Sequence, residues 1–377
     1  MRILSVFGTR PEAIKMAPLV QTLAADPDIE ARVAVTAQHR EMLDQVLDIF
    51  GIKPDYDLNL MKHGQNLADI TSGALNGMLE IIKAAQPDLL LVHGDTTTTF
   101  AGALAAFYAK IPCGHVEAGL RTYNKYAPFP EEMNRQLTAC LADYHFAPTA
   151  TAKANLLAQN IPAEKIVITG NTVIDALLAT VAKCGSLAGL ALDDVDWQRP
   201  VILLTCHRRE NWGQPMTEIF NAIRQIVLDF PEVQVIFPVH KNPLVQEKAR
   251  AILGNLKNVF LIEPVDYAAM ATLMNRSYLV LTDSGGLQEE APALGKPVLV
   301  LREVTERPEA IAAGTARLAG ISQGSVYAAT KKLLTDKADY AKMAQAINPY
   351  GDGHASERIL AAIKAWQKGE PPENWQP

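Results

Sequence analysis

The chain has 377 residues, of which 49% are hydrophobic and 20% are charged. This composition is typical of a globular protein and excludes a disordered one, and the length favours two domains over a single core. The net charge of −6 comes without any basic run, so nucleic acid is not expected as a partner. The sequence also lacks the stretch of about 18 apolar residues that a membrane span needs.

The cysteines and the N-terminus point to a cellular compartment. The cysteines are scattered without a CxxC pair, at Cys113, Cys140, Cys184 and Cys206. This pattern suits the reducing cytosol and gives no zinc site. The opening MRILSVFGTRPEAIK has an apolar run that is too short for a signal peptide and is broken by Arg10 and Glu12. We therefore expect a cytoplasmic protein with no leader and no membrane partner.

Short apolar runs alternate with amphipathic stretches along the chain, which is typical of parallel α/β units. In the first half the runs are 3–7, 32–35, 88–93, 112–116, 144–147 and 166–168. In the second half they are 201–205, 233–238, 258–262, 278–282 and 297–301. The pattern pauses near Gly170, and the polar segment 186–199 resembles a connector. The predicted fold class is α/β, with two Rossmann-like, doubly wound domains facing a cleft and ligands beyond the carboxyl ends of the strands.

The segment YLVLTDSGGLQEEAPALGKPVLV predicts an anion site. Ser284, Gly285 and Gly286 lie between a strand end and a helix start, where backbone N–H groups can approach a phosphate closely. Glu289 and Glu290 are predicted in the first turn of that helix, where a carboxylate would cap the helix and bind neutral hydroxyls such as those of a ribose. A nucleotide-sugar pocket satisfies both features. The alternative is a tight turn before a well-capped helix.

The first predicted strand leads into GTRPE, with Lys15 following. Pro11 suits the first position of a helix, so Arg10 and Lys15 are predicted near the positive end of that helix. A diphosphate could lie there, and a helix start with solvated charges is an equal alternative. Because GxGxxG and GxxxxGK[ST] are both missing, neither a nicotinamide cofactor in its usual site nor a P-loop is expected.

Titratable residues follow several other predicted strands. In HGDTTTT, the threonines could cap a helix as well as Asp95, which leaves Asp95 available for chemistry. HVEAGLRT places Glu117 after the next strand, PFPEEMNR brings Glu131 near a helix start, and CHRREN places His207 after the first strand of the second domain. Singly each residue could be solvated or structural, but together they converge where the cleft is expected, as acid–base chemistry requires. No HExxH motif or close histidine pair supports a metal site.

A series of ordered motifs resembles the non-hydrolysing UDP-N-acetylglucosamine 2-epimerases of bacteria. The motifs are GTRPEAIKMAPL, TAQHREMLDQVL, HGDTTTT, HVEAGLRT, PFPEEMNR, GNTVIDAL, CHRREN, LTDSGGLQEEAP, TERPEA and NPYGDG, and they extend to about Gly353. The resemblance implies a fold of the GT-B type, in which domain 1–170 is completed by 355–377 and 171–354 forms the UDP-binding domain. It also implies a homodimer that uses no cofactor and interconverts UDP-N-acetylglucosamine and UDP-N-acetylmannosamine.

The resemblance also implies roles for individual residues. Arg10, Lys15, Ser284, Gly285, Gly286, Glu290 and Arg307 would bind the UDP-sugar, and Asp95, Glu117, Glu131 and His207 would be catalytic. A second UDP-N-acetylglucosamine would act as activator at a site that includes Gln38, His39, Arg209 and His240, although the residues alone favour an ordinary polar helix start at 38–39. One departure from the family is Cys206, where glycine is commoner and where a thiol could crowd the loop that carries His207.

The chemistry implied by the family explains how the weakly acidic proton on carbon 2 of the sugar can be removed. The proton on carbon 2 of an N-acetylhexosamine lies next to an acetal and is barely acidic, so direct deprotonation is unattractive. Elimination of UDP develops positive charge at carbon 1 and acidifies that proton, and 2-acetamidoglucal and UDP are the implied intermediates. Alternatives are a retaining glycosyltransferase of the same fold, a hydrolysing epimerase and a non-catalytic nucleotide-sugar sensor.

Overall fold

The computed structural model describes residues 1–37, 40–61, 64–183 and 186–377. They form two compact units. Unit 1 comprises Met1–Ala176 and Tyr350–Pro377, and unit 2 comprises Leu177–Pro349. The segment 186–199 belongs to unit 2, where Leu192 and Val195 are buried. None of the helices in the described ranges combines the length and the apolar character needed to cross a membrane.

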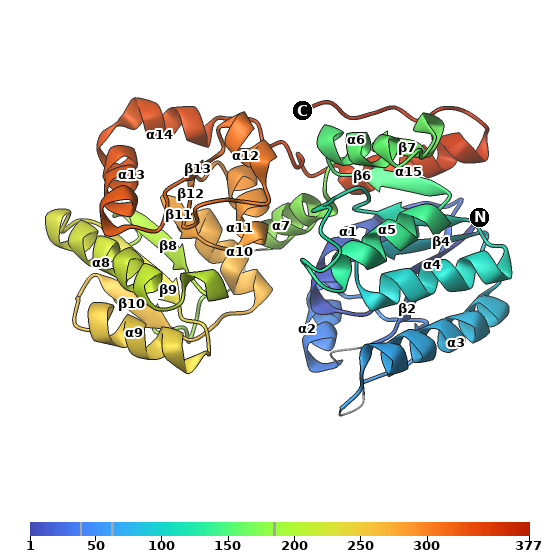
Figure 1. The fold of residues 1–377 in the computed structure, drawn as a ribbon, viewed down its shortest axis with the longest axis horizontal. Helices are drawn as coiled ribbons and strands as arrows, with labels where there is room; N and C mark the ends of the chain where they lie inside the picture. The colour runs from blue at the N-terminus through green and yellow to red at the C-terminus, as the bar shows by residue number, and fades with distance from the viewer. Residues whose placement is uncertain (38–39, 62–63, 184–185) are drawn as a thin grey trace. The chain divides into compact units, whose positions relative to one another are not determined.

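Unit 1 is built on a seven-stranded parallel sheet in the order β3-β2-β1-β4-β5-β6-β7. The strands are β1 (Arg2–Phe7), β2 (Glu30–Val35), β3 (Tyr56–Asp57), β4 (Leu89–His93), β5 (Cys113–Val116), β6 (Tyr144–Ala147) and β7 (Ile166–Ile168). The helices are α1 (Arg10–Ala25), α2 (Arg40–Phe50), α3 (Leu67–Ala85), α4 (Thr97–Ala109), α5 (Glu131–Leu141), α6 (Ala150–Ala158), the start of α7 (Thr172–Ala182) and α15 (Ala355–Gln367). They cover both faces of the sheet (Figure 1), which explains why its central strands are continuous apolar runs.

The end of the chain returns to unit 1, where α15 lies beside β6 and β7 (Figure 1, red). Trp366 of α15 stacks on Tyr144 of β6, with ring centroids 4.3 Å apart. Beyond the helix, the N–H of Trp375 donates to the carbonyl oxygen of Ile168 at 2.9 Å. The C-terminal tail therefore covers part of β7, which would otherwise be an open sheet edge.

Unit 2 is built on a six-stranded parallel sheet in the order β10-β9-β8-β11-β12-β13. The strands are β8 (Val201–Thr205), β9 (Gln234–Pro238), β10 (Val259–Ile262), β11 (Leu279–Thr282), β12 (Val298–Val300) and β13 (Ala316–Leu318). The helices include α8 (Gln214–Asp229), α9 (Pro243–Leu253), α10 (Tyr267–Arg276), α11 (Gly285–Glu290), α12 (Pro308–Ala313), α13 (Gln323–Thr335) and α14 (Lys337–Ala344). In both sheets the strand order reverses at one point, between β1 and β4 and between β8 and β11. The predicted α/β class with two doubly wound sheets is confirmed.

Two edge strands were not predicted. β3 is only Tyr-Asp and β13 is only Ala-Arg-Leu, so neither contains the apolar run that indicates a buried strand. Each is a strand because its neighbour, β2 or β12, offers a parallel edge on which to pair. Their existence is a property of the assembled sheet.

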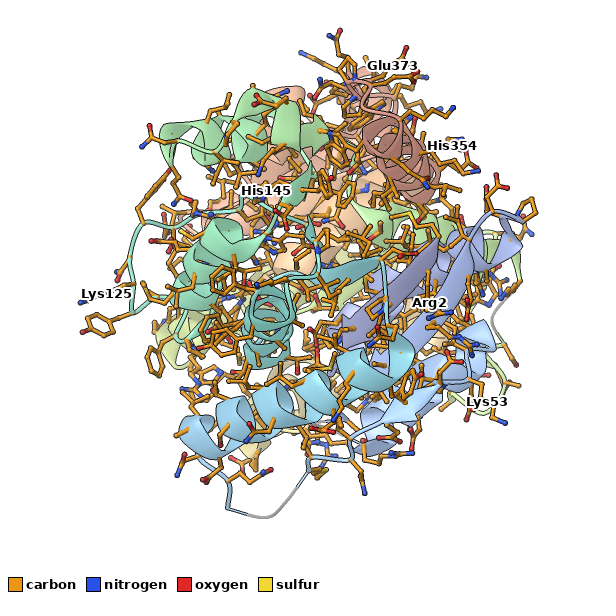
Figure 2. All side chains as sticks on the ribbon, turned by 90° about the vertical axis from the view of Figure 1, so that its right-hand side faces the viewer. Arg2, Lys53, Lys125, His145, His354 and Glu373 are labelled. Carbon is orange, nitrogen blue, oxygen red and sulfur yellow. The ribbon has the colours of Figure 1, made fainter. Side chains whose placement is uncertain are left out.

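Buried histidines lie on three adjacent strands of unit 1. His93 ends β4, and His115 and His145 are register partners on β5 and β6. His145 lies among the interior side chains, as Figure 2 shows. Burial lowers the pKa of both His93 and His145 to about 4. These imidazoles are therefore neutral in the folded protein at pH 7.

We expect the free energy of unfolding to fall as the pH drops from 6.5 to about 4. Between these pH values the histidines of the unfolded chain take up protons while those buried in the folded chain stay neutral, so acid favours unfolding. Above pH 6.5 the histidines are neutral in both states, and the stability no longer depends on their titration. His145→Gln, which cannot titrate, should flatten the slope of stability against pH in urea titrations. His354→Gln should leave the slope unchanged, since His354 lies on the surface (Figure 2). Equal slopes for wild type and His145→Gln would contradict this account.

Candidate active site

A buried carboxylate stands at the carboxyl end of β5. Glu117 lies at φ 60°, in the left-handed region that is unfavourable for a residue with a Cβ. Its side chain is 6% exposed and forms an ion pair with Lys15. Nδ2 of Asn171 donates to Oε2 of Glu117 at 3.2 Å, and Nη2 of Arg135 lies 3.8 Å from Oε1. Backbone strain that is held in place by several partners is typical of a functional position.

The charge of Glu117 is set by these neighbours. Burial alone would raise the pKa of Glu117, but the positive charges of Lys15 and Arg135 outweigh it and hold the pKa below its ordinary value. Nε2 of His93 lies 3.6 Å from Oε2 of Glu117, and burial lowers the pKa of His93 to about 4. The arrangement at neutral pH is an ionised carboxylate beside a neutral imidazole.

Asp95 joins the same group from the end of β4. It forms an ion pair with Arg135, which also approaches Glu117. Asp95 does not cap α4, because Oγ1 of Thr96 accepts the N–H of Thr99 at 3.2 Å and serves as the N-cap. Asp95 is therefore not needed to cap this helix, as the sequence indicated. We call Lys15, Asp95, Glu117, Arg135 and Asn171 the Glu117 cluster.

Glu131 is the first residue of α5. Its Oε2 is buried and has no hydrogen-bond partner within the described ranges. A buried carboxylate oxygen without a partner is costly unless a ligand or water meets it. Arg135 lies four residues further along the same helix, on the same face as Glu131. The helix thus places Glu131 one turn from the residue that joins Asp95 and Glu117.

The backbone amides just before α1 are hydrogen-bonded to a side chain of the same helix. The N–H groups of Gly8 and Thr9 donate to Oε2 of Glu12 at 3.0 and 2.8 Å. Burial raises the pKa of Glu12 above its ordinary value. These two amides are therefore occupied, and Lys15 belongs to the Glu117 cluster. Arg10 is the first residue of the helix and is half-buried.

In unit 2, the ends of β8 and β11 are joined by Asp283. Its Oδ2 accepts the N–H groups of His207 and Arg208, both at 2.8 Å, and Nδ2 of Asn211 at 3.0 Å. Its Oδ1 lies 3.1 Å from Nδ1 of His207. Although burial favours the neutral acid, the contacts with His207 and Arg208 hold the pKa of Asp283 below its ordinary value. The His207 ring is thereby oriented, while Cys206 before it is 1% exposed and packs in the core of unit 2.

The start of α11 can receive an anion. Ser284 is its N-cap residue, Gly285 and Gly286 form its first two positions, and no side chain of the described chain caps its amides. A Cβ added at Gly285 would lie 3.6 Å from Nη2 of Arg208 and 3.7 Å from Nη2 of Arg307. Helix-start amides flanked by two guanidinium groups favour a phosphate.

The position of Glu289 and Glu290 corrects the sequence analysis. They are not in the first turn of α11 but are its last two residues, because the helix begins at Gly285 and is six residues long. Glu289 forms an ion pair with Arg307, and Oε1 of Glu290 accepts the hydroxyl of Tyr267 at 3.1 Å. Neither carboxylate contributes to capping the helix start.

The residues predicted for the activator site are only partly described. Gln38 and His39 lie outside the described residues. His240 follows β9, and its ring stacks on the ring of His207 with centroids 5.8 Å apart. Arg209 is exposed, two residues beyond His207. The structure thus brings His240, but not Arg209, into contact with a predicted catalytic residue.

Several residues of the two groups were not singled out from the sequence. They are His93, Arg135, Asn171, Arg208 and Asp283. His93 ends a predicted strand and Asp283 directly follows one, each just before a candidate, so their position at a strand end was a usable signal. Arg135 and Asn171 gave no such signal, because their contacts depend on how α5 and α7 lie against β5.

Comparisons with known proteins identify the family of this chain. The family model for UDP-N-acetylglucosamine 2-epimerase matches residues 21–364. The UDP-N-acetylglucosamine 2-epimerase of Bacillus subtilis (strain 168) is 58% identical over 363 residues, which cover 96% of this chain and 95% of that protein. The enzyme of the same name from Escherichia coli (strain K12) is 54% identical over 370 residues, which cover 97% and 98%.

A solved structure extends the comparison to three dimensions. The crystal structure of UDP-GlcNAc 2-epimerase from Neisseria meningitidis bound to UDP-GlcNAc matches with a TM-score of 0.86 and 49% identity. The match covers 97% of this chain and 100% of that one. The resemblance seen in the sequence is confirmed: the chain belongs to the UDP-N-acetylglucosamine 2-epimerase family, a family of isomerases.

Proposed function

We propose that this chain interconverts UDP-N-acetylglucosamine and UDP-N-acetylmannosamine by inverting carbon 2 without net hydrolysis. The observation that carries the proposal is the Glu117 cluster, in which Arg135 contacts two carboxylates beyond the ends of β4 and β5. This is the side of a doubly wound sheet where ligands bind, near the point at which the strand order reverses. Membership of the family supports a UDP-sugar as the substrate.

The residues of unit 2 are proposed to hold the UDP group. Elimination breaks the bond between carbon 1 and the diphosphate oxygen, and the electron pair leaves with UDP. Arg208, Arg307 and the amides of Gly285 and Gly286 would stabilise that charge, because fixed positive groups act strongly on charge that develops during the reaction. Ser284 and Glu290 would complete the pocket, with Glu290 on the ribose hydroxyls, and Arg10 of unit 1 would contact the nucleotide.

The residues of unit 1 are proposed to act on the sugar. Glu117 is held as an anion, so it is a weak base and would mainly stabilise positive charge at carbon 1. Asp95 and Glu131 would exchange the proton of carbon 2, one on each face of the 2-acetamidoglucal intermediate. Re-addition of UDP with protonation on the opposite face then completes the inversion. His207 would carry a proton or contact the leaving phosphate.

Product formed in heavy water from UDP-N-acetylglucosamine alone should carry deuterium at carbon 2. Elimination gives up the original hydrogen and re-addition takes one from an acid that has exchanged with solvent. Proton NMR measures epimerisation and exchange together. A glycosyltransferase would make no UDP-N-acetylmannosamine without an acceptor, and a hydrolysing enzyme would accumulate UDP and free N-acetylmannosamine. Complete retention of the original hydrogen would contradict elimination with exchange.

We also propose that UDP-N-acetylglucosamine activates the enzyme. The family resemblance and the stacking of His240 on His207 support an activator beside the catalytic residues. UDP-N-acetylmannosamine alone should therefore turn over slowly with an initial lag, and a trace of UDP-N-acetylglucosamine should remove the lag. Gln38→Ala and His39→Ala should weaken activation more than substrate binding. Hyperbolic kinetics without a lag would exclude an activator site.

The proposal includes a homodimer in the cytoplasm. The family resemblance supports the dimer, and the free thiols of Cys113, Cys140 and Cys206 suit a reducing compartment. Light scattering should give a mass near twice 41.0 kDa. A mass of one chain at assay concentration would exclude the dimer.

A further inference from the structure

Asn171 connects the Glu117 cluster to two other parts of the chain. It is 2% exposed and lies between β7 and α7. Besides donating to Oε2 of Glu117 at 3.2 Å, its side chain accepts the N–H of Val173 at 3.1 Å through Oδ1. Its backbone N–H donates to the carbonyl oxygen of Tyr350 at 2.6 Å. One residue therefore contacts the catalytic candidate, the first turn of α7 and the returning C-terminal segment.

Both connections between the units of the chain run next to this residue. The chain leaves unit 1 after Ala176, within α7, and re-enters it at Tyr350. Gly351 has φ 147°, and a Cβ there would lie 3.3 Å from Cγ1 of Ile174 and 3.6 Å from the backbone nitrogen of Asn171. The returning segment is thus packed closely against the turn that carries Asn171, so a shift in either connection is transmitted to it.

We propose that Asn171 is a positioning residue, which fixes the direction of the Glu117 carboxylate and couples it to the two chain connections. The ion pairs with Lys15 and Arg135 determine the charge of Glu117, whereas the neutral amide of Asn171 adds a directional hydrogen bond. Such a bond depends more strongly on angle than an ion pair does, so it selects one direction of the Glu117 carboxylate. This inference rests on the proposed function.

The alternative role of Asn171 is only to cap α7. Asparagine, aspartate and serine are similarly good N-cap residues, because each can accept an N–H of the first turn. Asn171→Asp and Asn171→Ser therefore keep the acceptor for Val173 but remove the amide donor. Asn171→Asp also places a second negative charge about 3 Å from Glu117.

Asn171→Ser should lower kcat by about tenfold, and Asn171→Asp by more, with KM changed less than about twofold. The activity of Asn171→Asp relative to wild type should rise as the pH falls, because a protonated aspartate can again donate to Glu117. Asn66→Asp is the matched control: Asn66 caps α3 by accepting the N–H of Asp69 at 3.0 Å. It should keep wild-type kcat and pH profile.

The coupling to the returning segment is tested with glycines. Gly351→Ala should lower kcat without changing KM, because its Cβ would lie only 3.3 Å from Cγ1 of Ile174, in the first turn of the helix that Asn171 precedes. Gly189→Ala also places a Cβ at a positive φ, 80°, but this Cβ would have no neighbour within 4 Å among the described residues. It should keep wild-type kcat.

The outcomes separate this inference from the proposed function. A wild-type chain that makes no UDP-N-acetylmannosamine would refute the proposed function. An active wild type with normal kcat in Asn171→Asp, or with equal losses in both Asn171 variants and unchanged pH profiles, would overturn the positioning role alone. If circular dichroism shows that Asn171→Asp does not fold, the test rests on Asn171→Ser and Gly351→Ala. Normal kcat in both of these variants would overturn the positioning role of Asn171.

Discussion

Glu117→Gln should lower kcat at least ~100-fold while the chain remains folded. Glutamine has the size of glutamate but cannot carry the negative charge that is proposed to stabilise carbon 1. The replacement removes the ion pair between Lys15 and Glu117, whereas Arg135 still pairs with Asp95. We therefore expect a loss of stability as well, but not of the fold. Initial rates with UDP-N-acetylglucosamine and thermal unfolding monitored by circular dichroism measure the two effects separately.

The other two carboxylates should behave in the same way. Asp95→Asn and Glu131→Gln are each expected to cost ~100-fold or more, since each removes a group able to exchange a proton. Glu132→Gln is the control, because Glu132 is a buried neighbour of Glu131 on α5 but accepts the N–H of Thr122 at 2.9 Å and serves the loop. A change of only a few-fold in kcat is expected there. A near-normal rate for Asp95→Asn, Glu117→Gln or Glu131→Gln would reduce that residue to a structural role.

Asp283→Asn should lower kcat about 100-fold through His207. In the native protein Nδ1 of His207 lies 3.1 Å from Oδ1 of Asp283, so the negative charge favours a proton on Nδ1 and leaves Nε2 as the nitrogen that can take one. The amide of asparagine can still accept the backbone N–H groups of His207 and Arg208, but it would turn its NH₂ group toward Nδ1. The imidazole would then carry its proton on Nε2 and lose its role as acceptor.

The pH profile distinguishes this effect from loop damage. A wrong imidazole tautomer changes the pH dependence of kcat, whereas a displaced loop raises KM and lowers the melting temperature. Asp266→Asn in the same unit is a control, because Asp266 caps α10 by accepting the N–H of Ala269 at 2.8 Å and asparagine caps equally well. Unchanged kcat and pH profile in Asp283→Asn would show that Asp283 does not act through His207.

Local sequence patterns were sufficient to predict the fold class and the positions of most of the candidates. Buried parallel strands are continuous apolar runs, so β1, β4, β8 and β11 could be recognised without a structure. Polar residues directly after such runs must lie at the carboxyl edge of a sheet. Asp95, Glu117 and His207 were found by that rule, and the ordered motifs identified the family.

The contacts between these residues could not be predicted from local patterns. Glu117 and Asn171 are 54 positions apart, and Asp283 and His207 are 76 apart, so each contact depends on the strand order. The ion pair between Lys15 and Glu117, which the sequence did not predict, depends on the strand order for the same reason. The strands β3 and β13 were not predicted because they too depend on pairing with a neighbouring strand. A local pattern shows where a strand or helix ends, but partners across a sheet are set by packing of the whole chain.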